Sequence, residues 1–156
     1  MQPVASQYRL MTQWKLSAPV SAVWAELMHP ESWPQWWKGV VAVKLLEPGD
    51  PNGIGAYRRM TWRGALPYRL TLNMRTVRIE PRSLIEAVAE GELTGTGVWQ
   101  LTRVGGGTDV SYDWIVDVTK PWMRTLHPIA KPLFSWNHHV VMEWGRKGLE
   151  RRVGVR

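Results

Sequence analysis

The sequence of 156 residues contains no cysteine. Disulfide bonds, thiol nucleophiles and thiolate metal sites are therefore excluded, whereas the redox compartment stays undetermined. No apolar run approaches the roughly 20 residues needed to span a membrane, and residues 1–7 lack the charged and apolar regions of a signal peptide. We therefore expect a cytoplasmic protein with one domain, residues 1–156, long enough to bury about 70% of its unfolded surface.

Phenylalanine is nearly absent, because a single Phe stands against eleven Trp. The large apolar side chains therefore mostly carry an indole N–H, which needs a partner when it is buried. Trp33, Trp36 and Trp37 lie close together around Pro34. This cluster either fills a gap under a sheet edge or forms a wall at the opening of a pocket.

Acidic residues are too few to balance the basic ones, and the net charge is +7. Such a charge favours anionic partners, for example nucleic acid, acidic lipid or a carboxylate ligand. The basic residues are spread along the chain without a dense run, which is typical of a solvated surface. Nucleic acid ranks last among these partners, because the aromatic and basic strand signature of an RNA-binding sheet is missing.

Alternation of apolar and polar residues predicts a first strand over residues 8–16. Ser17 and Pro19 then begin a short amphipathic helix, which His29-Pro30 ends, and residues 31–39 form a second short helix and turn. Turns rich in glycine and proline separate the six strands predicted next. These strands cover residues 40–46, 56–63, 67–79, 83–90, 95–104 and 108–118.

The last predicted element is a long helix from Pro121 to about Arg152. Its apolar residues recur at spacings of three and four, so one face must be buried. They are Leu126, Ile129, Ala130, Leu133, Val140, Val141, Trp144 and Gly148. Pro128 and Pro132 should kink or break the first half, so a regular helix is expected only from near Pro132.

Three residues of this helix stand out from its apolar face. Asn137 falls on the stripe, where its amide must find partners or face a wet cavity. Gly145 and Gly148 lower the helix propensity, which indicates that another backbone or a bulky ring packs closely there. An antiparallel sheet with one solvated face needs a cover, and this helix is the only element long enough. We therefore predict an α+β fold in which a curved antiparallel sheet of six to seven strands wraps around the helix.

Several segments carry a more specific pattern, namely Ala18–Trp24, Pro34–Val40 and Gly95–Trp99. The most specific one is Trp136-Asn137-His138 followed by Met142, Gly145, Gly148 and Leu149. Together with the order of elements, the pattern resembles the START-like (SRPBCC) superfamily and its bacterial polyketide cyclase/dehydrase-like branch. The resemblance implies a helix-grip fold with a deep apolar cavity between the long helix and the concave sheet. It also implies binding or transfer of hydrophobic molecules and, in some branches, cyclisation or dehydration, but no established catalytic set maps onto this sequence.

The inward positions of three predicted strands, combined with the helix stripe, give the expected lining of this cavity. They are Tyr68, Leu70, Leu72, Met74, Trp99, Tyr112, Trp114, Leu133, Asn137 and Val141. We predict that these residues bind the ligand. A slip of one residue in strand register would turn every strand side chain to the opposite face.

General acid–base chemistry in an apolar cavity is the enzymatic alternative, for which five polar groups are available. They are Tyr68, Tyr112, Glu86, Asn137 and His138. Each also has a structural interpretation, since a tyrosine can be a core ring, Asn137 can bond to backbone and His138 can brace the sheet end. Glu86 points to solvent if Ile85 and Ala87 are the inward pair.

We expect neither a metal nor a cofactor. The sequence has no glycine-flanked nucleophilic serine and no glycine-rich phosphate loop. His138 and His139 are adjacent, so they diverge by about 100° on a helix and cannot share one zinc.

Two functions therefore stay open. The first is binding of a small hydrophobic ligand, aromatic or polyketide-like, with or without cyclase or dehydratase chemistry. The second is a lipid- or quinone-binding and transfer module that docks on anionic membranes through its arginines, with exposed Trp33, Trp36 or Trp37 as interfacial anchors. The oligomeric state does not follow from the sequence.

Overall fold

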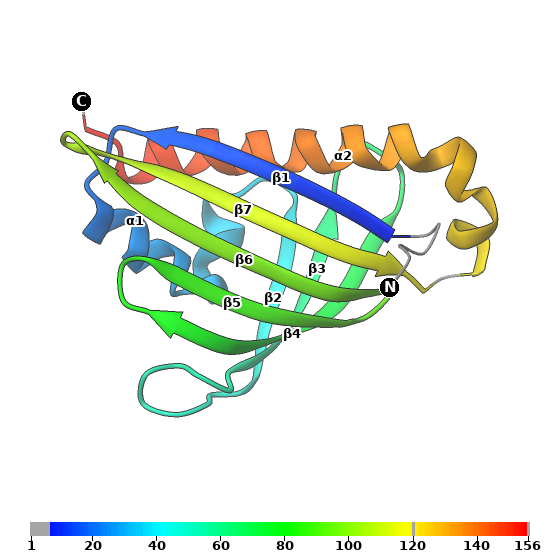
Figure 1. The fold of residues 1–156 in the computed structure, drawn as a ribbon, viewed down its shortest axis with the longest axis horizontal. Coiled ribbons are helices and arrows are strands. Elements are labelled where there is room, and N and C mark those ends of the chain that lie inside the picture. The colour runs from blue at the N-terminus through cyan, green and yellow to red at the C-terminus, as the bar shows by residue number, and fades with distance from the viewer. Residues whose placement is uncertain (1–6, 120, 156) are drawn as a thin grey trace.

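The computed structural model describes residues 7–119 and 121–155, without the side chains of residues 123 and 127. The elements follow one another as β1 (Gln7–Leu16), α1 (Val20–Leu27), the 3₁₀ helix η1 (Pro30–Gln35), β2 (Val40–Glu47), β3 (Tyr57–Arg63), β4 (Arg69–Glu80), β5 (Leu84–Gly91), β6 (Leu93–Val104), β7 (Gly107–Val118) and α2 (Pro121–Val153). The seven strands form one antiparallel sheet in the order β1-β7-β6-β5-β4-β3-β2. This sheet curves around α2 (Figure 1), which confirms the predicted α+β, helix-grip fold.

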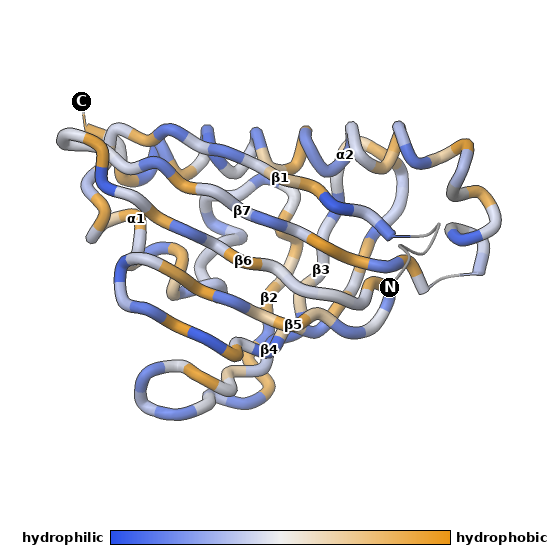
Figure 2. The backbone as a smooth tube through the Cα atoms, viewed as in Figure 1, coloured by the Kyte–Doolittle hydropathy of each residue, from blue (hydrophilic) through white to orange (hydrophobic). Residues whose placement is uncertain are grey.

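Strand register follows from the alternation of apolar and polar residues, which is visible along the strands in Figure 2. In β1, Tyr8, Trp14 and Leu16 are buried, whereas Arg9 and Lys15 are exposed. Tyr8 pairs with Val116 and Trp14 pairs with Val110 on β7, so that buried residues of neighbouring strands share the concave face. The concave face therefore provides a continuous apolar surface for α2.

The helix α2 begins at Pro121, as predicted, and it continues through Pro128 and Pro132 without a break. Its first turns bend away from the axis of the remainder (Figure 1), so the predicted kink is present. A proline removes one backbone hydrogen bond, and a bend accommodates its ring while solvent hydrates the freed carbonyl groups. No described helix is long and apolar enough to cross a membrane.

The tryptophan cluster after α1 lies in the core. Trp33, Trp36 and Trp37 are all buried, and Trp37 packs against Trp14 and the rings that surround it at centroid distances of 5.1–6.0 Å. The Trp33 indole donates to the Glu26 carbonyl (2.9 Å), and the Trp37 indole donates to the Val141 carbonyl of α2 (2.8 Å). The cluster therefore fills the space under the sheet edge, and its predicted role as an exposed membrane anchor is wrong. Trp33 and Trp37 also form part of the wall of a cavity, which was the other predicted role.

The two helix glycines explain how α2 is seated on these rings. A Cβ atom on Gly145 would lie 2.4 Å from Cε2 of Trp37, and one on Gly148 would lie 1.8 Å from the Trp36 carbonyl oxygen. Any side chain at either position would therefore push the helix off the cluster. The predicted close approach of a ring and a backbone to this part of the helix is confirmed.

Candidate functional site

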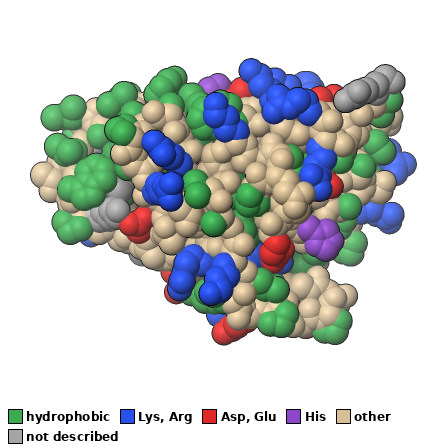
Figure 3. All heavy atoms as spheres, turned by 180° about the vertical axis from the view of Figure 1, so that it is seen from behind, with side chains coloured by type: hydrophobic (Ala, Val, Ile, Leu, Met, Phe, Trp, Pro, Cys, Tyr) green, Lys and Arg blue, Asp and Glu red, His purple; other side chains and the backbone are tan. Residues whose placement is uncertain are grey.

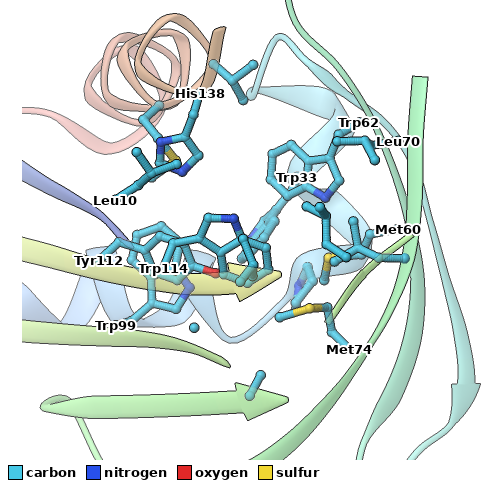
Figure 4. Close-up of a pocket in the computed structure, with 18 of the residues that line it drawn as sticks. Leu10, Trp33, Met60, Trp62, Leu70, Met74, Trp99, Tyr112, Trp114 and His138 are labelled. Atoms are coloured by element: carbon cyan, nitrogen blue, oxygen red, sulfur yellow. The ribbon is translucent and has the colours of Figure 1, made fainter. Parts of the chain in front are cut away.

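A cavity of about 210 Å³ lies between the concave face of the sheet and α2. Its walls come from β1, β3, β4, β5, β6, β7, η1 and α2, and they are mostly apolar and aromatic (Figure 4). A buried water occupies about 30 Å³, so the space is far larger than a packing defect. It also lies below the range of about 300–1,000 Å³ typical of sites for drug-sized ligands, so a compact ligand fits it best.

Nine of the ten residues predicted to line the cavity do so. They are Tyr68, Leu70, Leu72, Met74, Trp99, Tyr112, Trp114, Asn137 and Val141. Their role in binding stays a prediction, whereas the register on which it rests is the observed one.

Leu133 is the exception, since its side chain is 53% exposed. The neighbouring Phe134 lines the cavity instead, followed along the helix by Asn137, His138, Val141 and Met142. The inward face of α2 is therefore rotated by about one residue, or roughly 100°, from the predicted stripe in this part of the helix. Leu126 and Ile129 are exposed as well, because the bent first half of α2 does not lie against the sheet.

Three rings from β6 and β7 form an aromatic floor in the cavity (Figure 4). The ring of Tyr112 lies 4.2 Å from that of Trp99 and 5.8 Å from that of Trp114, the latter pair being stacked at an interplanar angle of 20°. The Tyr112 ring lies above Gly97, where an added Cβ would be 2.2 Å from its hydroxyl oxygen. Only glycine at that position leaves space for the phenol. Burial raises the pKa of Tyr112, so the phenol is neutral and serves as a hydrogen-bonding group.

Asn137 is buried on the cavity wall, as its position on the helix stripe predicts. Its Oδ1 accepts a hydrogen bond from the backbone N–H of Leu66 (3.1 Å), and its Nδ2 donates to the Tyr68 hydroxyl (3.4 Å). Burial raises the pKa of Tyr68, and burial together with Tyr68 raises the pKa of Tyr8 to about 12. Both phenols are therefore neutral at physiological pH.

Tyr68 and Phe134 line the cavity on the side of the first turns of α2, and both side chains are partly exposed. Their ring centroids are 5.9 Å apart, and the Tyr8 ring lies 6.2 Å from that of Phe134. We call this part of the cavity wall, the partly exposed rings of Tyr68 and Phe134 with the buried Tyr8 behind them, the cavity mouth.

His138 extends from α2 into the cavity, above the aromatic floor (Figure 4). Burial, and to a smaller extent the charge of His139, lowers the pKa of His138 to about 4. Its imidazole is therefore neutral at pH 7 and can donate one hydrogen bond and accept another.

The sequence reasoning missed Arg58. Its side chain lines the cavity with only 14% exposed, and its Nε donates to Glu31 at 2.7 Å. Arg58 shares the inward parity of β3 with Met60 and Trp62, both of which line the cavity, so the alternation along the strand could have identified it.

Glu86 does not belong to the site. Ile85 and Ala87 line the cavity, so Glu86 faces the convex side of the sheet. Among the described side chains, no group of three or more His, Asp or Glu is arranged to hold a metal ion.

Residues 9–153 match the family described as polyketide cyclase / dehydrase and lipid transport. No curated protein matches the chain in sequence. Solved structures share the fold, beginning with a protein from Thermus thermophilus at 19% identity, where the alignment covers 94% of this chain and 97% of that one with a TM-score of 0.75.

Two further structures extend the comparison. A START superfamily protein from Mycobacterium smegmatis is 15% identical, with 93% and 96% of the two chains covered and a TM-score of 0.75. The Zhui aromatase/cyclase from Streptomyces sp. R1128 is 16% identical, with 96% and 99% covered and a TM-score of 0.69. At these identities the likeness concerns the fold.

Proposed function

The chain belongs to the polyketide cyclase/dehydrase and lipid transport family, and on that premise we propose that it binds a small hydrophobic ligand, aromatic or polyketide-like, in the cavity under α2. The aromatic floor of Trp99, Tyr112 and Trp114 is the observation that carries the proposal. Flat rings on one wall stack against a flat ligand, and stacked aromatic pairs contribute about 0.5–1.5 kcal/mol beyond the area they bury.

The polar groups of the cavity supply orientation. Asn137 and Tyr68 lie together at one wall, and His138 is a neutral donor and acceptor. The Arg58 guanidinium lies beside the cavity with its Nε paired to Glu31, and its remaining N–H groups suit an oxygen-rich end of the ligand. A few convergent polar groups in an apolar pocket are typical of small-molecule sites.

Binding ranks above acid–base catalysis because of the direction of the pKa shifts. A general acid or base works best with a pKa near the working pH. Here the pKa of His138 falls to about 4, while those of Tyr68 and Tyr112 rise. The pKa values of all three groups therefore lie further from 7 than those of the free side chains, and cyclase or dehydratase chemistry requires a substrate that shifts them back.

The test compares two substitutions on β5 that differ only in the face of the sheet. Ala87→Phe places a ring inside the cavity, whereas Val88→Phe places the same ring on the convex face, where Val88 is 40% exposed. Binding of an anilinonaphthalene dye, and of aromatic compounds that displace it, should fall at least tenfold in Ala87→Phe and stay unchanged in Val88→Phe. Equal binding by the two folded variants would refute the cavity as the site.

A second candidate function is the binding and transfer of a lipid or quinone. It is supported by the family's description and by the cavity mouth, where apolar rings lie at the surface beside Trp122 of α2. Native mass spectrometry of the protein purified from its source distinguishes the two, because a long-chain lipid and a compact aromatic molecule differ in mass.

A further inference from the structure

The N-terminal half of α2, on both sides of the prolines at 128 and 132, carries a stripe of exposed apolar side chains. Trp122, Leu126, Ile129, Leu133 and Trp136 follow one another at spacings of four, three, four and three residues, and each is between 45% and 82% exposed. Residues at these spacings share one side of a helix. In Figure 3, hydrophobic side chains gather at the end of the molecule where α2 begins. An exposed apolar surface of this kind marks an interaction site.

Basic residues flank this stripe. The sequence has no acidic residue between Asp117 and Glu143, while Arg124 and Lys131 are exposed on the helix. Arg63 and Arg69 are exposed at the two ends of the β3–β4 loop, whose Leu66 and Tyr68 bond to Asn137. None of these four cations forms an ion pair with a described acidic side chain. The apolar stripe and its cations together form what we call the α2 surface.

We propose that the α2 surface docks on an anionic lipid bilayer. Exposed tryptophan, leucine and isoleucine on a helix with basic neighbours are the composition of interfacial helices, in which apolar groups enter the headgroup region and cations contact anionic lipid. A second copy of the chain fits less well, because a twofold interface would bring the same cations against one another.

Docking through this surface turns the cavity mouth toward the bilayer. The Trp122 ring lies 6.2 Å from that of Tyr68 and 6.4 Å from that of Phe134, and Lys131 Nζ lies 5.8 Å from the Tyr8 ring centroid. A lipid-soluble ligand would then pass between membrane and cavity with little exposure to water. This last step rests on the proposed function, whereas docking itself does not.

Flotation with lipid vesicles tests the proposal in the full chain. The protein should float with vesicles of phosphatidylcholine and phosphatidylglycerol, and much less with phosphatidylcholine alone. Ile129→Glu/Leu133→Glu should lower the partition coefficient at least tenfold. The matched control Met11→Glu/Val104→Glu adds the same charge at residues that are 56% and 53% exposed elsewhere, and it should lower the coefficient far less.

A second pair of variants tests the charge. Arg124→Gln/Lys131→Gln should weaken binding to the anionic vesicles by about fivefold for each cation removed. Arg103→Gln/Arg151→Gln, in which the replaced cations are exposed outside the α2 surface, should change it little.

Three results would overturn the proposal: no flotation of the wild type, equal loss in the stripe variant and its control, or a dimer that the stripe variant converts to a monomer. Dye binding by the same variants keeps the two proposals apart. Lost flotation with retained dye binding supports the docking surface, and retained flotation without dye binding contradicts only the proposed ligand site.

Discussion

His138 shows how burial sets the chemistry of a single residue. The imidazole extends from α2 into an apolar cavity, where a positive charge would lose most of its hydration. The neutral form is therefore favoured, and the pKa falls from 6.5 to about 4. The residue can form hydrogen bonds to a ligand, but it does not compete as a base at pH 7.

This shift predicts a pH dependence of stability. In the unfolded chain His138 binds a proton below about pH 6.5, whereas in the folded chain it does so only below about pH 4. The contribution of neutral His138 to the free energy of unfolding is therefore fully present above pH 6.5 and is lost as the pH falls toward 4. The loss should be about 3 kcal/mol at most. Urea denaturation of His138→Gln should show a smaller loss over this range than the wild type. The exposed neighbour provides the control, since His139→Gln should keep most of the dependence, and identical curves for the wild type and His138→Gln would contradict the assignment.

Asn137 combines a structural and a cavity role. Asn137→Leu should leave the Leu66 N–H without its acceptor, which costs about 1–2 kcal/mol and lowers the melting temperature by several degrees. It should also lower the affinity for dyes and ligands with a polar end, because Tyr68 loses the amide that orients it. A leucine variant with full stability and unchanged dye binding would contradict both roles.

At the scale of elements, α2 has two halves with different surroundings. The second half rests on the tryptophans that follow α1, and Gly145 and Gly148 permit the contact. The first half extends past the sheet with its apolar stripe exposed. The prolines at 128 and 132 lie between these two environments, so the bend occurs where helix packing ends.

Gly148→Ala should destabilise the protein even though alanine raises helix propensity by about 1 kcal/mol. The added methyl group would meet the Trp36 carbonyl, and a backbone atom cannot move aside as a flexible side chain can. We expect a net loss of about 1–3 kcal/mol in urea denaturation. Gly106→Ala, at a hairpin tip with nothing within 4 Å, is the matched control and should be close to neutral. If Gly148→Ala is as stable as that control, α2 can shift away from Trp36 at no cost in stability, and the prediction is wrong.

At the scale of the whole molecule, side chains pack more densely on the concave side of the curved sheet at one end than at the other. Tryptophans from β1, η1, β3 and β6 pack solidly under the end that holds α1 and η1. A second cluster around Leu72, Leu93 and Trp114 lines the other end, and the cavity extends along both. The densely packed part holds the sheet and α2 in place around the cavity.

The sequence by itself determined the element order, the seven strands, the inward faces of β4, β6 and β7 and the burial of Asn137, since alternation and helical periodicity are local signals. It also indicated that a bulky ring or another backbone segment packs closely against Gly145 and Gly148. The tertiary structure alone decided that Trp33, Trp36 and Trp37 are core residues, because exposure depends on distant partners such as Val141. It likewise decided that Leu133 faces out and Phe134 in. Periodicity defines a face of an element, but only packing defines what that face meets.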